Sequence, residues 1–233
     1  MTRRLAIIPA RGGSKRIPNK NIRDFCGRPM IMHIIETARS TKLFSTIHVS
    51  TENDRIRNIV ARFGFSPDFL RPKELADDQT PIMPVLKYVA LEYQKRGSEF
   101  DEIWLLMACA PLVQPCDLLR ASEKFSNLAS KRPLIGVREY PAPIEWAFVM
   151  GKGGSLTPLQ PGKFSCRSQD LAKRYFDAGC FAIFPADVVL SSQGAGSDNG
   201  FVGYPLEKNS AIDIDDEEDW SLAEALYKSR QVI

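Results

Sequence analysis

A basic stretch with paired glycines near the start of the chain carries side chains suited to holding an anion. It spans residues 8–21, Ile-Pro-Ala-Arg-Gly-Gly-Ser-Lys-Arg-Ile-Pro-Asn-Lys-Asn. Two adjacent glycines let a backbone approach a ligand and present N–H groups to it, while arginine can hold two phosphate oxygens at once. The spacing matches neither a Walker A loop nor G-x-G-x-x-G. It predicts a phosphate-binding loop of another kind, with a solvated basic turn as the alternative; the residues concerned are Arg11, Gly12, Gly13, Ser14, Lys15 and Lys20.

A second group of charged side chains lies near the other end of the chain, where Asp213 and Asp215 stand two residues apart. On a strand, side chains with this spacing point to the same face. Two neighbouring carboxylates repel each other unless a cation separates them, and Mg²⁺ bound to phosphates needs only one or two protein carboxylates. The pair therefore predicts a magnesium site. The alternative is an acidic helix start, which suits residues 216–219 better.

The elements that must position these groups follow from hydrophobic periodicity. Buried strands are predicted at residues 5–9, 46–50 and 102–108, and amphipathic helices at residues 31–38, 56–63, 82–93 and 118–128. Either Asn53 or Asp54 can cap the second helix, and Asp117 the fourth. Alternating strands and helices predict a three-layer α/β/α fold with a mainly parallel sheet. Ligands of such sheets bind at the carboxyl ends of the strands, and the basic loop directly follows the first strand.

The alternation breaks between residues 138 and 177, where prolines and glycines accumulate. This composition predicts irregular turns and short hairpins, forming a lid or an arm inserted in a single domain of residues 1–233. Strand-like sequence resumes at residues 180–184, and a last helix is predicted from near Asp216. His33 and His48 lie in apolar periodic segments, which favours structural roles for both.

Composition excludes several classes of protein. The chain has 233 residues and a net charge of +3, with 44% hydrophobic and 25% charged residues. These values exclude a disordered chain, a collagen and a coiled coil. The longest apolar run, residues 103–113, is too short to cross a bilayer. No secretory signal is evident, so we expect no membrane association and a cytoplasmic location. Five cysteines without C-x-x-C spacing argue against disulfides and zinc.

Positive charge is concentrated at the start of the chain. Residues 1–28 contain eight basic residues and one acid, a net charge of +7. Such a segment could bind nucleic acid, but its charges stand among glycines behind a strand, and no aromatic residues alternate with them for base stacking. A small anion such as a nucleotide phosphate fits better, and we expect no nucleic-acid partner.

Four segments, in this order, resemble signatures of one enzyme family. They are the loop of residues 8–21, Val49-Ser50-Thr51-Glu52, Arg71-Pro72-Lys73-Glu74-Leu75-Ala76-Asp77-Asp78, and Ile212-Asp213-Ile214-Asp215. Together they resemble the sugar-activating cytidylyltransferases, the CMP-sialic acid synthetase family. The resemblance implies a nucleotide-diphospho-sugar transferase-like fold with a small dimerisation arm. It also implies CTP and an acidic nine-carbon sugar as substrates, Mg²⁺ as cofactor, and a homodimer in which the arm reaches the other subunit.

The resemblance also assigns roles to individual residues. It implies nucleotide binding by Ala10, Arg11, Gly12, Gly13, Ser14, Lys15, Lys20, Asn21 and Arg71. It implies catalytic roles for Arg11, Lys15, Lys20, Asp213 and Asp215, with the two aspartates as metal ligands. For the sugar it implies Arg167, Gln169 and Asp170, because an arginine suits a substrate carboxylate. From the residues alone, Arg71 could instead form a surface ion pair with Glu74 or Asp78, and residues 167–170 could be a polar loop.

Within the family, the arm and the segments after it are similar to the branch that activates pseudaminic acid. They are residues 140–147, 167–171 and 177–179. Enzymes for sialic acid carry a Q-P-T-S-P-L-R-like motif after the central strand, whereas residues 107–113 here lack its Gln and Arg. This departure favours a substrate other than the usual sialic acid. The alternatives are activation of sialic acid, legionaminic acid or the eight-carbon KDO, and a non-catalytic nucleotide-binding module.

Overall fold

A six-stranded sheet forms the centre of the computed structural model, which describes residues 2–129, 131–197 and 199–230. The strand order is β10-β6-β9-β5-β1-β4. The strands are β1 (Arg4–Pro9), β4 (Thr46–Ser50), β5 (Glu102–Leu106), β6 (Leu134–Glu139), β9 (Tyr175–Pro185) and β10 (Val202–Pro205). Only β9 runs antiparallel to its neighbours β5 and β6, while the other pairings are parallel. The prediction of a mainly parallel sheet is confirmed.

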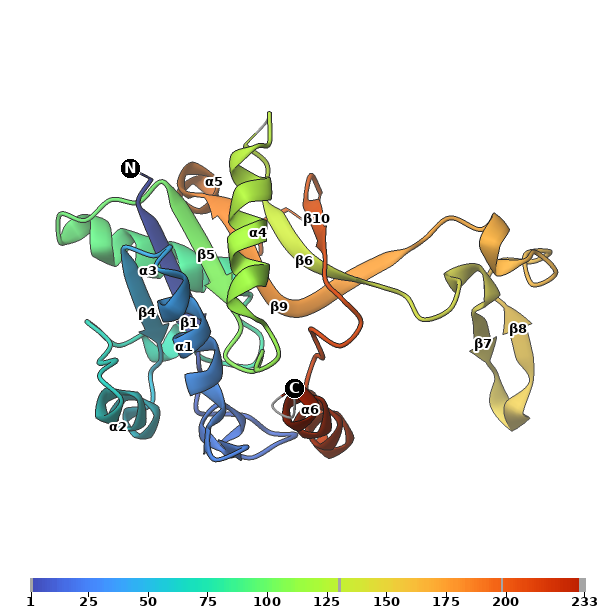
Figure 1. Cartoon of the computed structure of the whole chain (residues 1–233), viewed down its shortest axis with the longest axis horizontal. Helices are drawn as coiled ribbons and strands as arrows, with labels where there is room; N and C mark the ends of the chain where they lie inside the picture. The colour runs from blue at the N-terminus through green and yellow to red at the C-terminus, as the bar shows by residue number, and fades with distance from the viewer. Residues whose placement is uncertain (1, 130, 198, 231–233) are drawn as a thin grey trace.

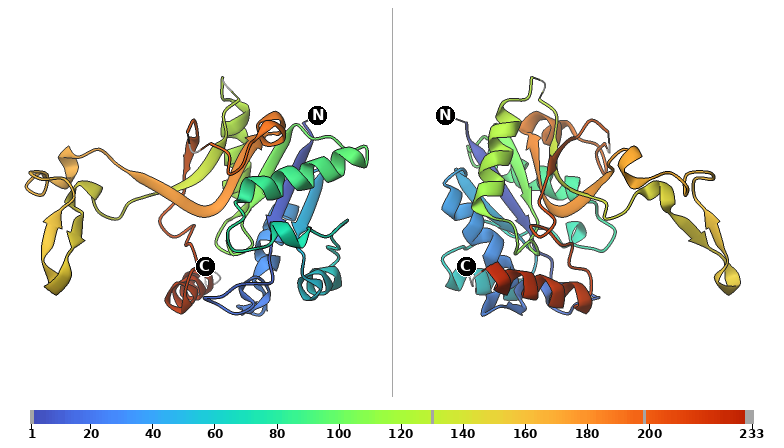
Figure 2. Two further views of the ribbon diagram at one scale, coloured as in Figure 1. Left: turned by 180° about the vertical axis from the view of Figure 1, so that it is seen from behind. Right: turned by 45° about the vertical axis from the view of Figure 1, so that its right-hand side comes forward.

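Helices cover both faces of this sheet (Figure 1). Ala6 and Ile8 of β1 face a core shared with α1 (Met30–Thr41), α2 (Asp54–Arg62) and α4 (Pro115–Ser126). Leu5 and Ile7 point the opposite way, toward α3 (Ile82–Lys95) and α5 (Ala186–Ser191), which come forward in the rear view of Figure 2. The alternation of one strand between two apolar cores establishes the three layers.

A third, smaller core joins the two ends of the chain. Ile17, Phe25 and Met30 pack there against Ile214 and Trp220, the latter from the last helix, α6 (Glu217–Arg230). Two short strands, β2 (Asp24–Phe25) and β3 (Arg28–Pro29), form the turn before α1. Since burying apolar surface holds these segments together, the early basic loop and the late acidic segment become neighbours.

The predicted arm projects from the body in all views (Figures 1 and 2). Strands β6 and β9 run into it as its two stems, pairing as far out as Glu139 and Tyr175. Its far end holds a two-stranded hairpin of β7 (Phe148–Met150) and β8 (Leu156–Pro158). The remaining elements are 3₁₀ turns, η1 (Lys20–Ile22), η2 (Lys73–Leu75), η3 (Ile144–Trp146), η4 (Lys152–Gly154) and η5 (Ser168–Asp170).

Several local predictions were wrong in detail. The helix α4 begins at Pro115, so Asp117 is not its cap; from the first turn its carboxylate accepts the N–H of Gln114 (2.9 Å). Residues 213–215 are irregular rather than a strand. Strand β9 is longer than the predicted segment 180–184, and β10 was not predicted. Among the described residues, no helix combines the length and apolar character needed to cross a bilayer.

Candidate active site

A cavity of about 320 Å³ opens at the carboxyl ends of β1 and β5, where the fold predicts a ligand. Side chains from the early loop, the 71–82 segment, the turn after β5 and the 213 region all line it. The predicted site residues among its lining are Arg11, Ser14, Lys15, Lys20, Asn21, Arg71 and Asp213. Most of the residues expected to bind nucleotide and metal therefore meet at one cavity, although Ala10, Gly12, Gly13 and Asp215 are not part of its lining.

The glycine loop is held against the start of α2. The backbone N–H of Ala10 still belongs to the sheet, since it donates to the Ser50 carbonyl (2.9 Å). Gly12 comes so close to Asn53 that an added Cβ would lie 2.2 Å from the side-chain nitrogen. Asn53 is in turn the cap of α2, accepting the N–H groups of Arg55 and Ile56. Glycine at position 12 is thus required by the packing of the loop on a helix cap.

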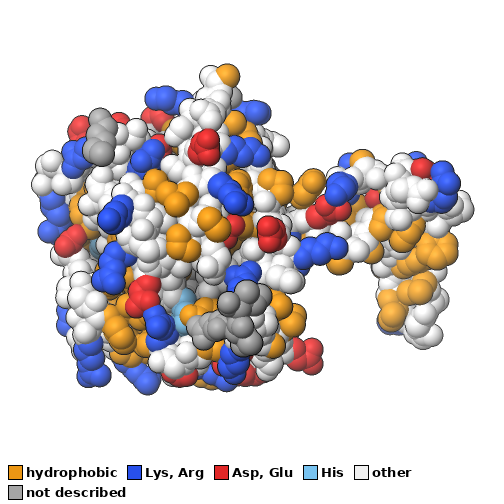
Figure 3. Space-filling view, in the orientation of Figure 1, with side chains coloured by type: hydrophobic (Ala, Val, Ile, Leu, Met, Phe, Trp, Pro, Cys, Tyr) orange, Lys and Arg blue, Asp and Glu red, His pale blue; other side chains and the backbone are white. Residues whose placement is uncertain are grey.

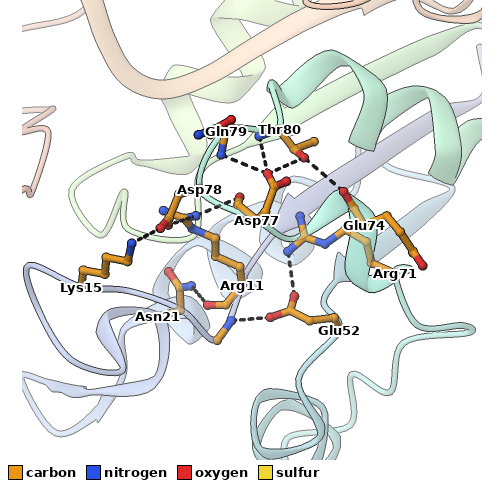
Figure 4. Close-up of polar contacts among 11 residues, drawn as sticks. Arg11, Lys15, Asn21, Glu52, Arg71, Glu74, Asp77, Asp78, Gln79 and Thr80 are labelled. Atoms are coloured by element: carbon orange, nitrogen blue, oxygen red, sulfur yellow. Dashed lines mark hydrogen bonds and ion pairs between the residues drawn. The ribbon is translucent and has the colours of Figure 1, made fainter.

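Two basic residues of the loop share one carboxylate across the cavity mouth (Figure 4). Arg11 donates to Oδ1 of Asp78 (2.5 Å) and to the backbone oxygen of Asp77 (3.0 Å), and Lys15 pairs with Oδ2 of Asp78. Hydrogen bonding from Lys15 holds the pKa of Asp78 below its usual range, so this carboxylate is charged. All three side chains are at least one-third exposed, so water and solutes can reach them.

Arg71 is buried deeper in the same cavity wall. Its guanidinium pairs with Glu52 (Nη2–Oε2, 3.0 Å), and the other oxygen of Glu52 accepts the N–H of Gly12 (2.7 Å; Figure 4). The alternative of a surface ion pair with Glu74 or Asp78 is therefore wrong, because Arg71 is buried and its partner is Glu52. The Nε of Arg71 is buried without a partner in the described residues. Glu52 therefore joins the glycine loop to Arg71.

The acidic pair meets the basic loop as predicted, by a different local geometry. Arg16 pairs with Asp215 (2.7 Å), and Lys20 donates to the Ile214 carbonyl (2.5 Å). Ile214 is buried in the third core, which fixes the flanking aspartates without a strand. The helix-start alternative also holds in part: Asp216 and Asp219 form reciprocal caps at the start of α6.

The predicted metal ligand Asp213 carries a carboxylate that is repelled by the charge of Asp215. Burial, followed by the charge of Asp215, raises its pKa. Its carboxylate packs against Gly179, where an added Cβ would lie 3.0 Å from Cγ. A divalent cation would relieve the repulsion, and carboxylate oxygens are hard donors. No group of three or more His, Cys, Asp or Glu side chains suited to a metal occurs among the described residues, so phosphate oxygens would have to complete the coordination of Mg²⁺.

Asn21 is a bridge inside the site. Its amide nitrogen donates to the Arg11 carbonyl (3.0 Å), and its oxygen accepts the Sγ–H of Cys109 (3.2 Å). Burial raises the pKa of Cys109 to about 12, so the thiol keeps its proton and acts as a donor rather than a nucleophile. Cys109 belongs to the segment where sialic acid enzymes carry their Gln-containing motif, and together with Met107 it lines the cavity.

The predicted sugar residues lie elsewhere. Arg167 and Asp170 pair with each other (2.8 Å) on the arm, and Gln169 is exposed between them. The arm extends away from the body, so the structure does not bring these residues to the cavity of the same chain (Figure 1). Trp146 packs on Phe164 within the arm and donates to the Cys166 carbonyl (3.2 Å).

Two residues were missing from the predicted site. Glu52 and Asp78 are the partners of Arg71, Arg11 and Lys15, yet the sequence hypothesis gave Glu52 no role and considered Asp78 only as a partner of Arg71. A signal was present, because both stand in segments that carried the family resemblance. The hypothesis weighed only groups that could bind an anion, and acids that organise those groups do not fit that criterion.

The fold and the cavity define a class: α/β enzymes that transfer nucleotidyl groups. The family model described as cytidylyltransferase matches residues 5–147, and this chain belongs to that family. The pseudaminic acid cytidylyltransferase of Campylobacter jejuni is 35% identical over 224 residues, covering 96% of each chain. The CMP-N,N'-diacetyllegionaminic acid synthase of Legionella pneumophila is 28% identical and covers 97% of each.

A solved structure supports the fold independently. A CMP:2-keto-3-deoxy-manno-octonic acid synthetase, complexed with CTP, superimposes with a TM-score of 0.73. The alignment covers 98% of this chain and 100% of that chain at 17% identity. The predicted nucleotidyltransferase architecture is thereby confirmed.

Proposed function

We propose that this enzyme transfers CMP from CTP to pseudaminic acid, a nine-carbon nonulosonic acid, and releases pyrophosphate. The observation that carries the proposal is the shared cavity of the Arg11–Lys20 loop and Asp213. The similarity to the Campylobacter jejuni enzyme over nearly the whole chain supports the choice of sugar. A purely binding module would not need a carboxylate placed beside its cations.

The reaction follows from what the cavity offers. The oxygen of the sugar's anomeric hydroxyl forms a bond to the α-phosphorus, and the bond from that phosphorus to the β-phosphate bridging oxygen breaks. The hydroxyl proton passes to solvent water, and pyrophosphate leaves with the electron pair of the broken bond. Because negative charge grows on the leaving group, the chain must supply positioned cations. Arg11, Lys15 and Lys20 fill this role, and Ser14 adds a donor.

The base and ribose would lie along the buried wall. Arg71 lines this wall, and its guanidinium is a donor suited to a carbonyl oxygen of cytosine. Asn21 acts by holding the loop, through Arg11 and Cys109. Asp213 and Asp215 would hold Mg²⁺, which when bound screens charge on the phosphates and orients them.

The sugar would be held by a second copy of the chain. The arm carries Arg167, Gln169 and Asp170 away from its own cavity, and its hairpin exposes apolar side chains. We propose a homodimer in which each arm lies on the partner and brings these residues to the partner's cavity. An arginine there could form a forked contact with the sugar carboxylate.

The activity is tested with a panel of acid sugars. Purified protein, Mg²⁺ and CTP should release pyrophosphate with pseudaminic acid, and more slowly or not at all with legionaminic acid, sialic acid and KDO. Preference for another sugar would move the assignment within the family. No turnover with any of the four would reject it.

The shared site is tested by mixing two inactive variants. Asp213→Asn disables the cavity but leaves the arm intact, and Arg167→Ala does the reverse. After random reassociation half of the dimers are mixed, and each has one complete site, so about a quarter of wild-type activity should return. If the arm served its own chain's cavity, mixing would restore none.

A further inference from the structure

The carboxylate of Asp78 occupies the cations that are expected to hold phosphate. Arg11 contacts one of its oxygens (2.5 Å) and Lys15 the other. One carboxyl group thus bridges two cations through two oxygens, as a phosphate group does. Figure 4 shows the three side chains converging at the mouth of the cavity.

The segment that carries Asp78 is built to present it. The carboxylate of Asp77 accepts the N–H groups of Gln79 (3.0 Å) and Thr80 (2.6 Å), and the Thr80 hydroxyl donates to the Glu74 carbonyl (3.2 Å). This turn is closed by its own bonds, and Arg11 also donates to its Asp77 carbonyl (3.0 Å). None of these backbone contacts uses the Asp78 carboxylate, so displacing that side chain leaves them in place.

We propose that Asp78 is an internal stand-in for phosphate: it neutralises Arg11 and Lys15 in the free enzyme and is displaced when a polyphosphate binds. This inference rests on the proposed function, because it needs the same cations to hold the triphosphate. On this proposal, Asp78 sets the affinity of the site for CTP and pyrophosphate.

A comparison with the neighbouring ion pair, Arg71–Glu52, explains why a ligand would displace Asp78 rather than Glu52. Arg71 and Glu52 are buried, with side chains 4% and 16% exposed, and Glu52 also binds the loop backbone. Lys15 is 79% exposed and Asp78 39%. An exposed ion pair is weak and screened by salt, whereas breaking a buried one leaves a charge without a partner. Displacement of Asp78 by the phosphates of a ligand therefore costs little free energy.

Displacement has a quantitative signature. If a polyphosphate binds only the form in which Asp78 has left, its apparent dissociation constant is the intrinsic one divided by the fraction of that form. The fraction is a property of the protein. Removing the carboxylate should then tighten every ligand that uses both cations by one common factor, and should leave cytidine, which has no phosphate, unaffected.

The test compares Asp78→Asn with a matched control, Glu74→Gln. Glu74 is an exposed acid on the same segment that joins the turn through its backbone oxygen, so its variant removes the same charge without touching the cations. Calorimetric titrations use CTP, inorganic tripolyphosphate and cytidine. We expect Asp78→Asn to bind CTP and tripolyphosphate about two- to tenfold more tightly than wild type, with a smaller gain at high salt. Glu74→Gln should show little change with either.

Three outcomes overturn the proposal. Weaker CTP binding by Asp78→Asn would make Asp78 a contact of the nucleotide or its metal. Equal gains in both variants would reduce the effect to overall charge, and unchanged binding would make the ion pairs irrelevant. Failure of the proposed function looks different, because wild type would then release no pyrophosphate from CTP with any of the four sugars; the tripolyphosphate titration still decides the role of Asp78.

Discussion

The cavity and the arm are built on opposite principles. The walls of the cavity come from segments far apart in sequence, and each is anchored in an apolar core, as with Ile17 and Ile214. The arm has no such core: Met150, Leu156 and Phe164 are 71%, 55% and 64% exposed. Figure 3 shows hydrophobic side chains gathered on the arm beside the mixed-charge surface of the body. The cavity is thus lined by residues of one chain, whereas the apolar side chains of the arm remain exposed in that chain.

This contrast between cavity and arm indicates which part of the function one subunit can carry alone. Rigid cores hold the cations and Asp213 in place, so we expect a lone subunit to bind nucleotide. An exposed apolar face of this kind marks an interaction surface. Transfer to the sugar would then need the second copy.

The largest effect on activity is expected when the cavity is disabled and the arm is left intact. Asp213→Asn should lower pyrophosphate release by at least about a hundredfold, because the metal contribution to charge stabilisation is lost. The midpoint of thermal unfolding should not fall, since burial already disfavours the charged form of Asp213. Asp216→Asn is the control: it removes the same charge three residues away, and asparagine still caps α6.

The arm can be disabled in the same manner. Leu156→Lys places a charge on the hairpin, opposite Met150 on β7. We expect light scattering to show half the wild-type mass and sugar transfer to be lost, while CTP binding and the unfolding midpoint stay near wild type. The exposed arm substitution Lys163→Gln should alter none of these. A fully active monomer would contradict the division of labour between cavity and arm.

A smaller effect separates the buried and exposed acids of the cavity. Glu52→Gln leaves the charge of Arg71 buried without a counter-charge and should lower the free energy of unfolding by about 1–3 kcal/mol. Asp78→Asn should change stability little, because its ion pairs are exposed. Urea denaturation of the two variants distinguishes them; equal losses would mean that both pairs are structural.

We expect a fall in pH to lower the stability of the body of the molecule, because both histidines are buried there. Burial lowers the pKa of His48 to about 4 and also lowers that of His33, whereas the arm contains no histidine. As pH falls below the ordinary histidine pKa of about 6.5, the unfolded chain takes up protons that the folded chain refuses, so stability falls. For His48 the loss is about 2 kcal/mol at pH 5.

The control for this effect is His48→Gln. Glutamine takes up no proton, so the stability gap between variant and wild type should narrow as pH falls from 7 to 5. Dimer mass should stay constant over the same range. A gap independent of pH would show that His48 takes up its proton as readily in the folded protein as in the unfolded chain.

Much of the fold could be predicted because its signals are local. Apolar residues with helical spacing placed α1, α2 and α3 correctly, and the proline- and glycine-rich composition of residues 138–177 marked the arm. Strand β10, with a glycine and a proline among its four residues, has no such pattern; it exists because β6 offers an open edge. The cap of α4 was misassigned because Gln114 and Asp117 both suit a helix start.

From the sequence we could predict which chemistry the protein carries: a basic glycine-containing loop, late carboxylates, and an arm of different composition, in an order typical of one family. The ion-pair partners, Glu52 for Arg71 and Asp78 for Arg11 and Lys15, and the absence of Arg167 from the lining of the cavity could be learned only from the folded structure. The type of each residue fixes its charge, whereas an ion pair forms only when two charged groups lie within a few ångströms of each other. That separation is set by cores that join residues as far apart as Phe25 and Trp220.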